Sequence, residues 1–182
     1  MRIDAQLLDD LTRQAQSNPR LRQNYDLRTT PEDNSQRMLN ALEPGTVLPI
    51  HRHRTTTEVL VILRGSATQY FYDDRGEVTE AVTIAVGSDC VGISVEKGRW
   101  HRIESLESGT VIMECKDGAY EPISQEDILD EKSALRNAVS CFVEMETRSG
   151  SMDPSLITPE YVCHMLGSRY SLEDIGAAMA EM

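Results

Sequence analysis

Between residues 36 and about 122 the chain consists of short runs of β-forming residues, separated by turn signals at intervals near ten residues. No helical pattern of useful length interrupts this stretch. Such an arrangement is typical of an antiparallel sandwich or barrel. We expect hairpin turns at residues 65–66 and 73–76, where glycine occurs with serine or aspartate. The expected strands are residues 37–42, 58–64, 67–72, 78–84, 90–95, 101–105 and 110–116.

The pattern on either side of this β region is helical. Asp4 can cap a helix that runs to about Ser17, because apolar residues recur at helical spacing between them. The sequence therefore predicts a β domain with its flanking N-terminal helix at residues 1–128, and a helical C-terminal extension at 129–182. The helices expected in the C-terminal part are 124–127, 134–147, 161–166 and one that starts near 171, with a loop at 148–151 and a helix stop at Gly167.

Charge and composition argue against several classes of partner. The 182 residues carry a net charge of −12, with a pI near 4.7. Such a chain repels phosphate backbones and anionic lipid surfaces, which disfavours nucleic-acid and membrane binding. No apolar run approaches about 18 residues, and acids stand near the N-terminus where a signal peptide needs an apolar segment, so we expect a cytoplasmic protein. The four cysteines have no CxxC spacing, which favours free thiols.

The histidines of the β region suggest a metal site. His51 and His53 lie two residues apart, so in a strand both side chains point to the same face. Glu58 follows a short polar loop that can return its carboxylate to the two imidazoles. Two histidines and one carboxylate suit a divalent transition metal, and His101 is the other histidine that a barrel can bring to them. An isolated HxH is frequent by chance at strand ends, so this interpretation depends on the wider spacing.

That wider spacing resembles the first signature motif of the cupin superfamily. The motif residues are Gly45, His51, His53, Glu58 and Gly65. The numbers of residues between successive members are five, one, four and six. The spacing agrees with the motif at every fixed position.

The second cupin motif is only partly present. Gly98 and His101 match its centre, whereas Glu96 stands where the family usually has proline and Ser105 where it usually has asparagine. These departures affect turn and packing positions rather than the ligand. The order of segments from SNPRLRQNYDLR to VIMECKDGAYEP is similar to that of WbuC-type cupins, small bacterial proteins often associated with surface polysaccharide gene clusters. This resemblance covers roughly residues 1–130.

The resemblance to cupins implies a mostly β fold, the double-stranded β-helix or jelly-roll-like barrel. It also implies that His51, His53, Glu58 and His101 bind Fe, Mn, Ni, Co or Zn, with positions on the ion left open for substrate or water. The cysteines are too widely spaced for a closed structural zinc site. The resemblance establishes neither a reaction nor the identity of the ion.

Alternation along the strands indicates which side chains face this site. With Glu58 inward, Leu60 and Ile62 share the interior face. Glu114 and Lys116 also share one face of their strand, which is either a solvated outer face or a wall of the metal cavity. In the second case they are the candidate catalytic residues, acting as acid, base or partner for a substrate charge.

Three classes of function remain open. The first is a metal-dependent protein acting on a small polar molecule, such as a sugar or sugar derivative, with isomerase and dioxygenase reactions as alternatives. The second is a non-catalytic module in which the metal holds a ligand. The third is transcriptional regulation through a DNA-binding C-terminal tail. However, residues 133–182 contain three Arg against seven Asp and Glu, and this net charge of −4 opposes DNA binding.

Electrostatics also predicts the kind of ligand. A divalent ion held by three neutral imidazoles and one carboxylate keeps a net positive charge, which attracts an anionic or polyhydroxylated molecule. We expect this ligand between the metal and Glu114, Lys116, Arg99 or Arg54. For the C-terminal helices we expect a packing or self-association role, and for the protein a homodimer.

Overall fold

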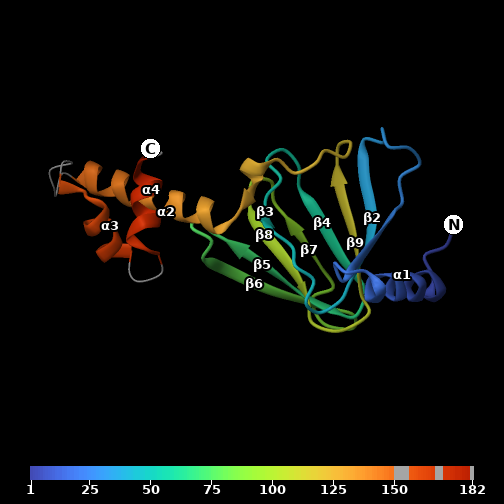
Figure 1. Cartoon of the computed structure of the whole chain (residues 1–182). Helices are drawn as coiled ribbons and strands as arrows, with labels where there is room; N and C mark the ends of the chain where they lie inside the picture. The colour runs from blue at the N-terminus through green and yellow to red at the C-terminus, as the bar shows by residue number, and fades with distance from the viewer. Residues whose placement is uncertain (150–155, 167–169, 181–182) are drawn as a thin grey trace. The chain divides into compact units, whose positions relative to one another are not determined.

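The computed structural model describes residues 1–149, 156–166 and 170–180. The chain forms two compact units, drawn together in Figure 1. The first unit comprises Met1–Tyr72 and Val78–Ile128, and the second comprises Asp73–Glu77 and Leu129–Met182. The two-domain organisation expected from the sequence stays a prediction.

Two antiparallel five-stranded sheets make up the first unit (Figure 1). The first sheet contains, in spatial order, β1 (Arg22–Asp26), β2 (Ser35–Leu42), β9 (Thr110–Asp117), β4 (Glu58–Arg64) and β7 (Gly92–Val95). The second contains β10 (Ile128–Leu129), β3 (Ile50–His51), β8 (Trp100–Ser105), β5 (Ser66–Tyr72) and β6 (Val78–Ala85). All seven expected strands are present with ends shifted by at most two residues, and β1, β3 and β10 are additional.

The strand pairing is that of one long hairpin wound into a barrel. β5 pairs with β6, β4 with β7, β3 with β8 and β2 with β9. These successive pairs alternate between the second and the first sheet. This winding is a jelly roll, the double-stranded β-helix of the cupin fold, so the fold class predicted from the sequence is confirmed.

The apolar core lies between the two sheets. As predicted for β4, Leu60 and Ile62 are buried, with 1% and 5% of their surface exposed, whereas Val59 and Val61 on the opposite face are 42% and 38% exposed. The alternation follows from the pleat of the strand. The core consists of Leu42, Leu60, Ile62, Ala67, Phe71, Ile84, Val95, Ile103 and Ile112.

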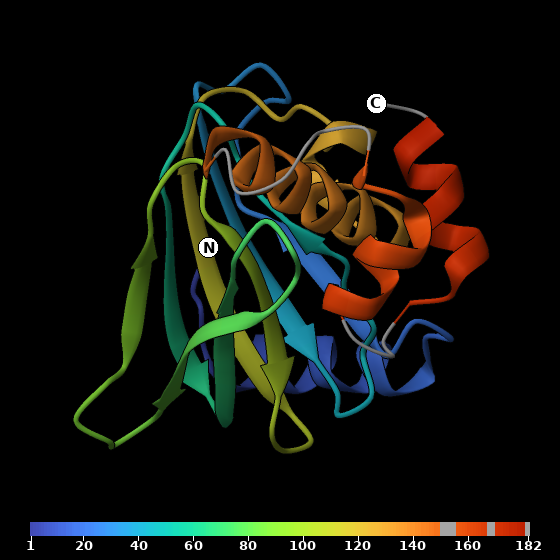
Figure 2. The same cartoon turned by 90° about the vertical axis from the view of Figure 1, so that its left-hand side faces the viewer.

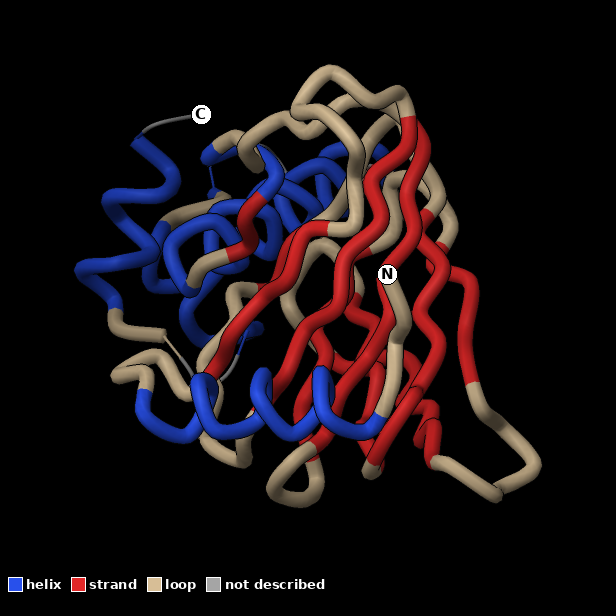
Figure 3. The backbone as a smooth tube through the Cα atoms, turned by 90° about the vertical axis from the view of Figure 1, so that its right-hand side faces the viewer, coloured by secondary structure: helices blue, strands red, loops and turns tan. Residues whose placement is uncertain are grey.

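Helix α1 (Ala5–Ser17) covers part of the outer face of the first sheet, and Figure 3 shows it running across the strands. The Asp4 carboxylate accepts the Leu7 backbone N–H at 3.1 Å, which is the predicted N-cap. Burial of its apolar stripe fixes the helix on the sheet. The residues of this second core are Leu8, Leu11, Ala15, Leu39, Ala41 and Val111.

The turn at Gly65 differs from the expectation. It connects β4 to β5, which belong to different sheets, so the predicted hairpin at residues 65–66 is wrong. Gly65 has a φ of +75°, and a Cβ there would lie 2.9 Å from Thr110 Cα, so this change of sheet needs glycine. The turn at residues 73–76 does close a hairpin, that of β5 and β6, as predicted.

The second unit is a group of packed helices, α2 (Glu131–Ser149), α3 (Pro159–Leu166) and α4 (Leu172–Ala180), which Figure 2 shows in orange and red. α3 and α4 begin as predicted, because Thr158 Oγ1 accepts the Tyr161 N–H and Ser171 Oγ accepts the Asp174 N–H. All three helices contribute to one core, which consists of Leu135, Val139, Phe142, Ile157, Val162, Ile175 and Ala178.

One detail of the C-terminal prediction is wrong. Arg148 and Ser149, expected in a loop at 148–151, belong to α2. The helix stop at Gly167 and the rest of that loop lie outside the described residues. Across the described part of the chain, no helix combines the length and apolarity needed to cross a membrane.

Candidate metal centre

Four side chains, three from residues 51–58 and one from residue 101, meet inside the barrel. His51 ends β3, and His101 is its register partner in β8. Glu58 opens β4 in the other sheet, while His53 lies in the loop between β3 and β4. Each of the four offers one ligand atom, and these atoms all lie within 4.8 Å of one another. The structure therefore brings His101 to the His51–His53 pair, as the sequence predicts.

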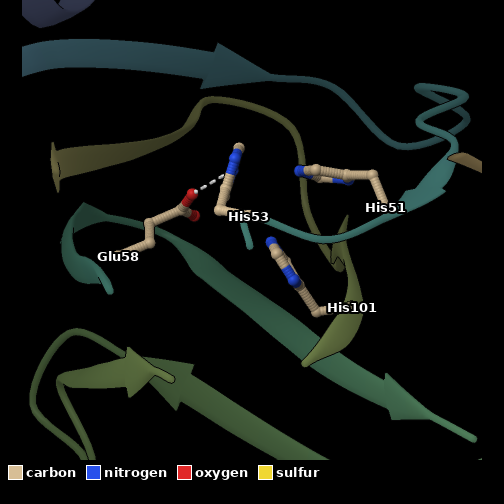
Figure 4. A group of neighbouring side chains, drawn as sticks. All are labelled: His51, His53, Glu58 and His101. Carbon is tan, nitrogen blue, oxygen red and sulfur yellow. Dashed lines mark ion pairs between the residues drawn. The ribbon is translucent and has the colours of Figure 1, made fainter. Parts of the chain in front are cut away.

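The ring geometry shows how compact the group is. The centroid of the His101 ring lies 4.3 Å from that of His51 and 5.7 Å from that of His53. Figure 4 shows the three rings and the Glu58 carboxylate around one space, with Glu58 Oε2 at 3.1 Å from His53 Nε2. Ligand bonds of roughly 2.0–2.2 Å place ligand atoms about 3–4.4 Å apart. A small inward movement would thus bring all four ligand atoms to one ion.

The local backbone that carries the two histidines of the HxH motif differs from the expectation. β3 ends at His51, so strand alternation does not explain why His53 converges with it. Hydrogen bonds hold the loop instead, because the Gly98 N–H donates to His53 O at 2.7 Å and the Arg52 N–H donates to Asp127 O at 3.1 Å. Gly98 adopts a φ of +79°, a conformation that favours glycine.

Arginine side chains on the other side of this loop are fixed by one acid. Asp127 Oδ1 accepts Arg52 Nε–H at 3.0 Å and Arg54 Nε–H at 2.6 Å. The Arg52 guanidinium also lies 4.1 Å from the Trp100 ring centroid. Arg54, expected beside the ligand, is thus engaged by Asp127. Sequence reasoning missed this role of Asp127, because the pattern around it indicated only the start of a short helix.

Hydrogen bonds to the backbone set the orientation of two imidazoles. The Nδ1–H of His101 donates to Arg99 O at 2.8 Å, and that of His51 donates to Pro49 O at 3.1 Å. Each ring therefore directs its Nε2 lone pair into the group. His101 is 2% exposed, and among the described residues its Nε2 has no hydrogen-bond partner. A buried acceptor without a partner is costly, and a metal ion would satisfy it.

The protonation states suit a cation. Burial lowers the pKa of His51 to about 4, aided by the nearby His101, and burial also lowers the pKa of His101. For Glu58, burial alone raises the pKa, but the hydrogen bond with His53 and the charge of Lys116 outweigh it, and the pKa falls well below its usual value. At neutral pH these imidazoles are neutral and the carboxylate is ionised, which is the state that metal ligation needs.

Glu114 and Lys116 lie on the inner wall of the barrel rather than on its solvated outer face. In β9, Lys116 is the register partner of Glu58, and Glu114 that of Leu60. The Lys116 side chain is 9% exposed, and its Nζ lies 3.0 Å from His53 Nε2, 3.4 Å from Glu58 Oε2 and 3.2 Å from Glu114 Oε1. The two residues predicted as catalytic are therefore next to the cluster, and their role stays a prediction.

Asn40 is a further member of this wall that sequence reasoning missed. Its Nδ2 donates to Glu114 Oε2 at 3.0 Å. Burial raises the pKa of Glu114, and the negative charge of Glu58 adds to the effect. Asn40 could be assigned to an expected strand, but nothing in the sequence shows that this strand is a neighbour of β9.

Gln69 is a buried amide on the inner side of β5. It is fully buried, and within the described residues its Oε1 has no hydrogen-bond partner. It lies two residues from Phe71, the register partner of His101, and so shares the interior face with that side chain. A glutamine in an apolar strand gave no signal in the sequence.

Comparisons with known proteins add little beyond this geometry. A family model described as a domain of unknown function (DUF6016) matches residues 3–84, and no curated protein sequence matches the chain. Among solved structures, KdgF from Halomonas sp. is similar with a TM-score of 0.46 and 13% identity, over 57% of this chain and 85% of its own.

Two further structures match over a smaller share of their own length. Oxalate decarboxylase of Bacillus subtilis, which has Mn(II) centres, gives a TM-score of 0.45 and 19% identity over 75% of this chain and 34% of that one. CapF gives a TM-score of 0.44 and 23% identity over 54% of this chain and 28% of its own. This chain thus spans only about a third of their length or less. With TM-scores below 0.5 these likenesses say nothing about activity, and the fold class follows from the strand pairing.

Proposed function

We propose that this cupin-fold protein binds a divalent transition metal, one of Fe, Mn, Ni, Co or Zn, through His51, His53, Glu58 and His101. The single observation that carries the proposal is the buried Nε2 of His101. This nitrogen has no hydrogen-bond partner among the described residues, although it lies next to one carboxylate and two further imidazoles. The other nitrogen of the ring, Nδ1, donates its hydrogen to the backbone at Arg99 O. Such a donor set suits a transition metal.

The side chains around the four ligands indicate the chemistry. A bound ion of this kind polarises an oxygen atom of its ligand. Glu114, whose pKa is raised by burial, can hold a proton at higher pH than an ordinary glutamate and donate it to a ligand. Lys116 supplies a positive charge on the same wall. Together these groups suit a small molecule that is anionic or polyhydroxylated.

This wall favours an enzyme over a module that only holds a ligand, because Glu114, a carboxyl group with a raised pKa beside the ligands, is suited to proton transfer. The resemblance to WbuC-type cupins suggests a sugar or sugar derivative of surface polysaccharide metabolism as substrate. A metal-dependent dioxygenase and a non-catalytic binding module are the alternatives. The predictions of a cytoplasmic location and a homodimer belong to this proposal.

The metal site is tested by titration of chelator-treated protein with Zn²⁺ and Mn²⁺, together with elemental analysis of the protein as purified. We expect one bound ion per chain, and His101→Ala should weaken binding at least about 100-fold, because it removes one of four ligands. His164→Ala is the matched control, since His164 is exposed and lies in α3 of the second unit. A wild-type chain that binds neither ion, or a His101→Ala variant that folds and binds as tightly, would contradict the proposal.

The ligand class is tested with metal-saturated protein. Phosphosugars, carboxylates and polyols should raise the melting temperature, whereas apolar compounds of similar size should not. Lys116→Ala should weaken the protection by phosphosugars and carboxylates more than the protection by polyols, because the variant lacks the positive charge that Lys116 places on the wall of the site. Turnover of a phosphosugar or nucleotide sugar would favour the enzyme, and protection without turnover would favour the binding module.

A further inference from the structure

The position of Lys116 is unusual for a residue that only lines a cavity. Its Nζ lies 3.0 Å from His53 Nε2 and 3.4 Å from Glu58 Oε2, and His53 and Glu58 are two of the four residues that would hold the metal. The third partner is Glu114 Oε1 at 3.2 Å. The side chains of Lys116, Glu58 and Glu114 are 9%, 6% and 19% exposed, so the ammonium is a largely buried cation between two largely buried carboxyl groups.

A metal ion and this ammonium need the same atom. A neutral imidazole has one lone pair on its unprotonated nitrogen, and a metal takes that lone pair as its ligand. If His53 Nε2 is unprotonated, Lys116 donates to it, and if it is protonated, it donates to Glu58 Oε2 at 3.1 Å. In both arrangements Nε2 is engaged next to a positive charge, so the ion can use it only after the ammonium has moved away.

The metal-free site also needs a positive charge. Glu58 Oε2 and Glu114 Oε1 lie 3.4 Å and 3.2 Å from Lys116 Nζ, so two carboxyl groups inside the barrel share this one cation. Buried carboxylates without a counter-charge are strongly destabilising. Lys116 neutralises this charge when no ion is present.

We propose that Lys116 is a built-in cation of the metal-free site, that a divalent ion displaces it from His53 and Glu58, and that this competition sets the metal affinity. The inference rests on the proposed metal site and adds how its affinity is regulated. Glu114 is the partner that remains for the displaced ammonium. Its Oε2 is anchored by Asn40, which leaves Oε1 directed to Lys116.

The test compares metal affinity in chelator-treated wild type and Lys116→Met, a variant of similar length without the charge. Titration with Zn²⁺ and Mn²⁺ by calorimetry should give a dissociation constant at least about tenfold lower for Lys116→Met, because the competing charge is gone. Lys116→Arg keeps a cation and should bind no more tightly than wild type. Lys132→Met, in α2, is the control for the loss of a lysine outside the site. The metal-free Lys116→Met protein should also have a lower melting temperature than metal-free wild type and gain more from the ion.

The outcomes separate the two proposals. If wild type binds the ions and Lys116→Met binds them equally or more weakly, the inference about Lys116 is wrong and the metal site stands. If wild type and Lys116→Met both fail to bind, both proposals fall. Lys116→Gln provides a second neutral variant should Lys116→Met not fold, and it too must bind more tightly than wild type.

Discussion

The two units of this protein bury different kinds of side chain. In the second unit the core is apolar, and Val139, Val162 and Ile175 are fully buried. All buried polar and charged residues among the described parts of the chain belong to the first unit, Glu58 and His101 included. Apolar burial stabilises a fold directly, whereas buried charge is costly unless it is paired. The difference indicates that the second unit is built for packing and the first also for chemistry.

Within the first unit the contrast recurs along the strands of one sheet. At one end of the inner face, Lys116 stands between its register partners Gln36 and Glu58. Four residues along the strand, the register partners of Ile112 are Asn40 and Ile62, and Ile112 and Ile62 belong to the apolar core. Because the charged residues gather toward one end, apolar side chains toward the other end can stabilise the barrel by burial.

The largest expected effect concerns the core of the second unit. Ile175→Ala should lower the free energy of unfolding of α2, α3 and α4 by about 2–5 kcal/mol, because it leaves a cavity among fully buried apolar side chains. Hydrogen exchange of the full chain should show faster exchange in these helices. Ile175→Val is the milder control, with a cost of about 1 kcal/mol. Metal affinity should stay unchanged, and a clear loss of affinity would show that the two units do not act separately.

The next effect is a pH dependence of the first unit in metal-free protein. The folded His51 stays neutral down to a pKa of about 4, whereas the unfolded histidine takes up a proton near 6.5. Between these values the unfolded chain binds more protons, so the free energy of unfolding should fall as the pH decreases from about 6.5 to about 4, by up to about 3 kcal/mol. His101 acts in the same direction, and Glu114 opposes it.

Comparison of variants isolates this contribution. Denaturant unfolding at several pH values in the presence of a chelator should give a smaller slope for His51→Gln than for wild type. His164→Gln, on the exposed face of α3, should keep the wild-type slope. Equal slopes for wild type and His51→Gln would show that the buried imidazole does not set this dependence.

The smallest expected effect tests the contacts of Asp127 with the two arginines next to the histidines, Arg52 and Arg54. Asp127→Asn should weaken metal binding about tenfold, because it weakens the hold on Arg52 and Arg54, which alternate with the histidines of the loop. Asp33→Asn is a matched control, since Asp33 pairs with Arg37 at 2.8 Å but does not contact this loop. An unchanged dissociation constant would show that the two backbone hydrogen bonds, Gly98 N–H to His53 O and Arg52 N–H to Asp127 O, suffice to place the loop.

Local patterns were enough to predict most elements and four ligand candidates. Alternation in the segment from Glu58 to Arg64 gave a strand with the correct inner face, and the N-cap at Asp4 gave the first helix. The turn at Gly65 was wrong, because a glycine turn between two strands looks the same whether the strands pair or enter different sheets. Partner choice among strands is a non-local property, and short-range signals do not contain it.

The sequence by itself determined the spacing of the histidines and Glu58, the alternation that puts Glu58 on the inner face of its strand, and the acidic charge. These are local or additive properties of the chain. Only the tertiary structure decided that Glu114 and Lys116 face the interior, since alternation leaves both faces open until a neighbouring strand and a second sheet enclose one of them. The contacts of Lys116 with His53, of Asn40 with Glu114 and of Asp127 with the loop depend on strand pairing and loop placement between distant segments, which the wound hairpin fixes only when it closes into a barrel.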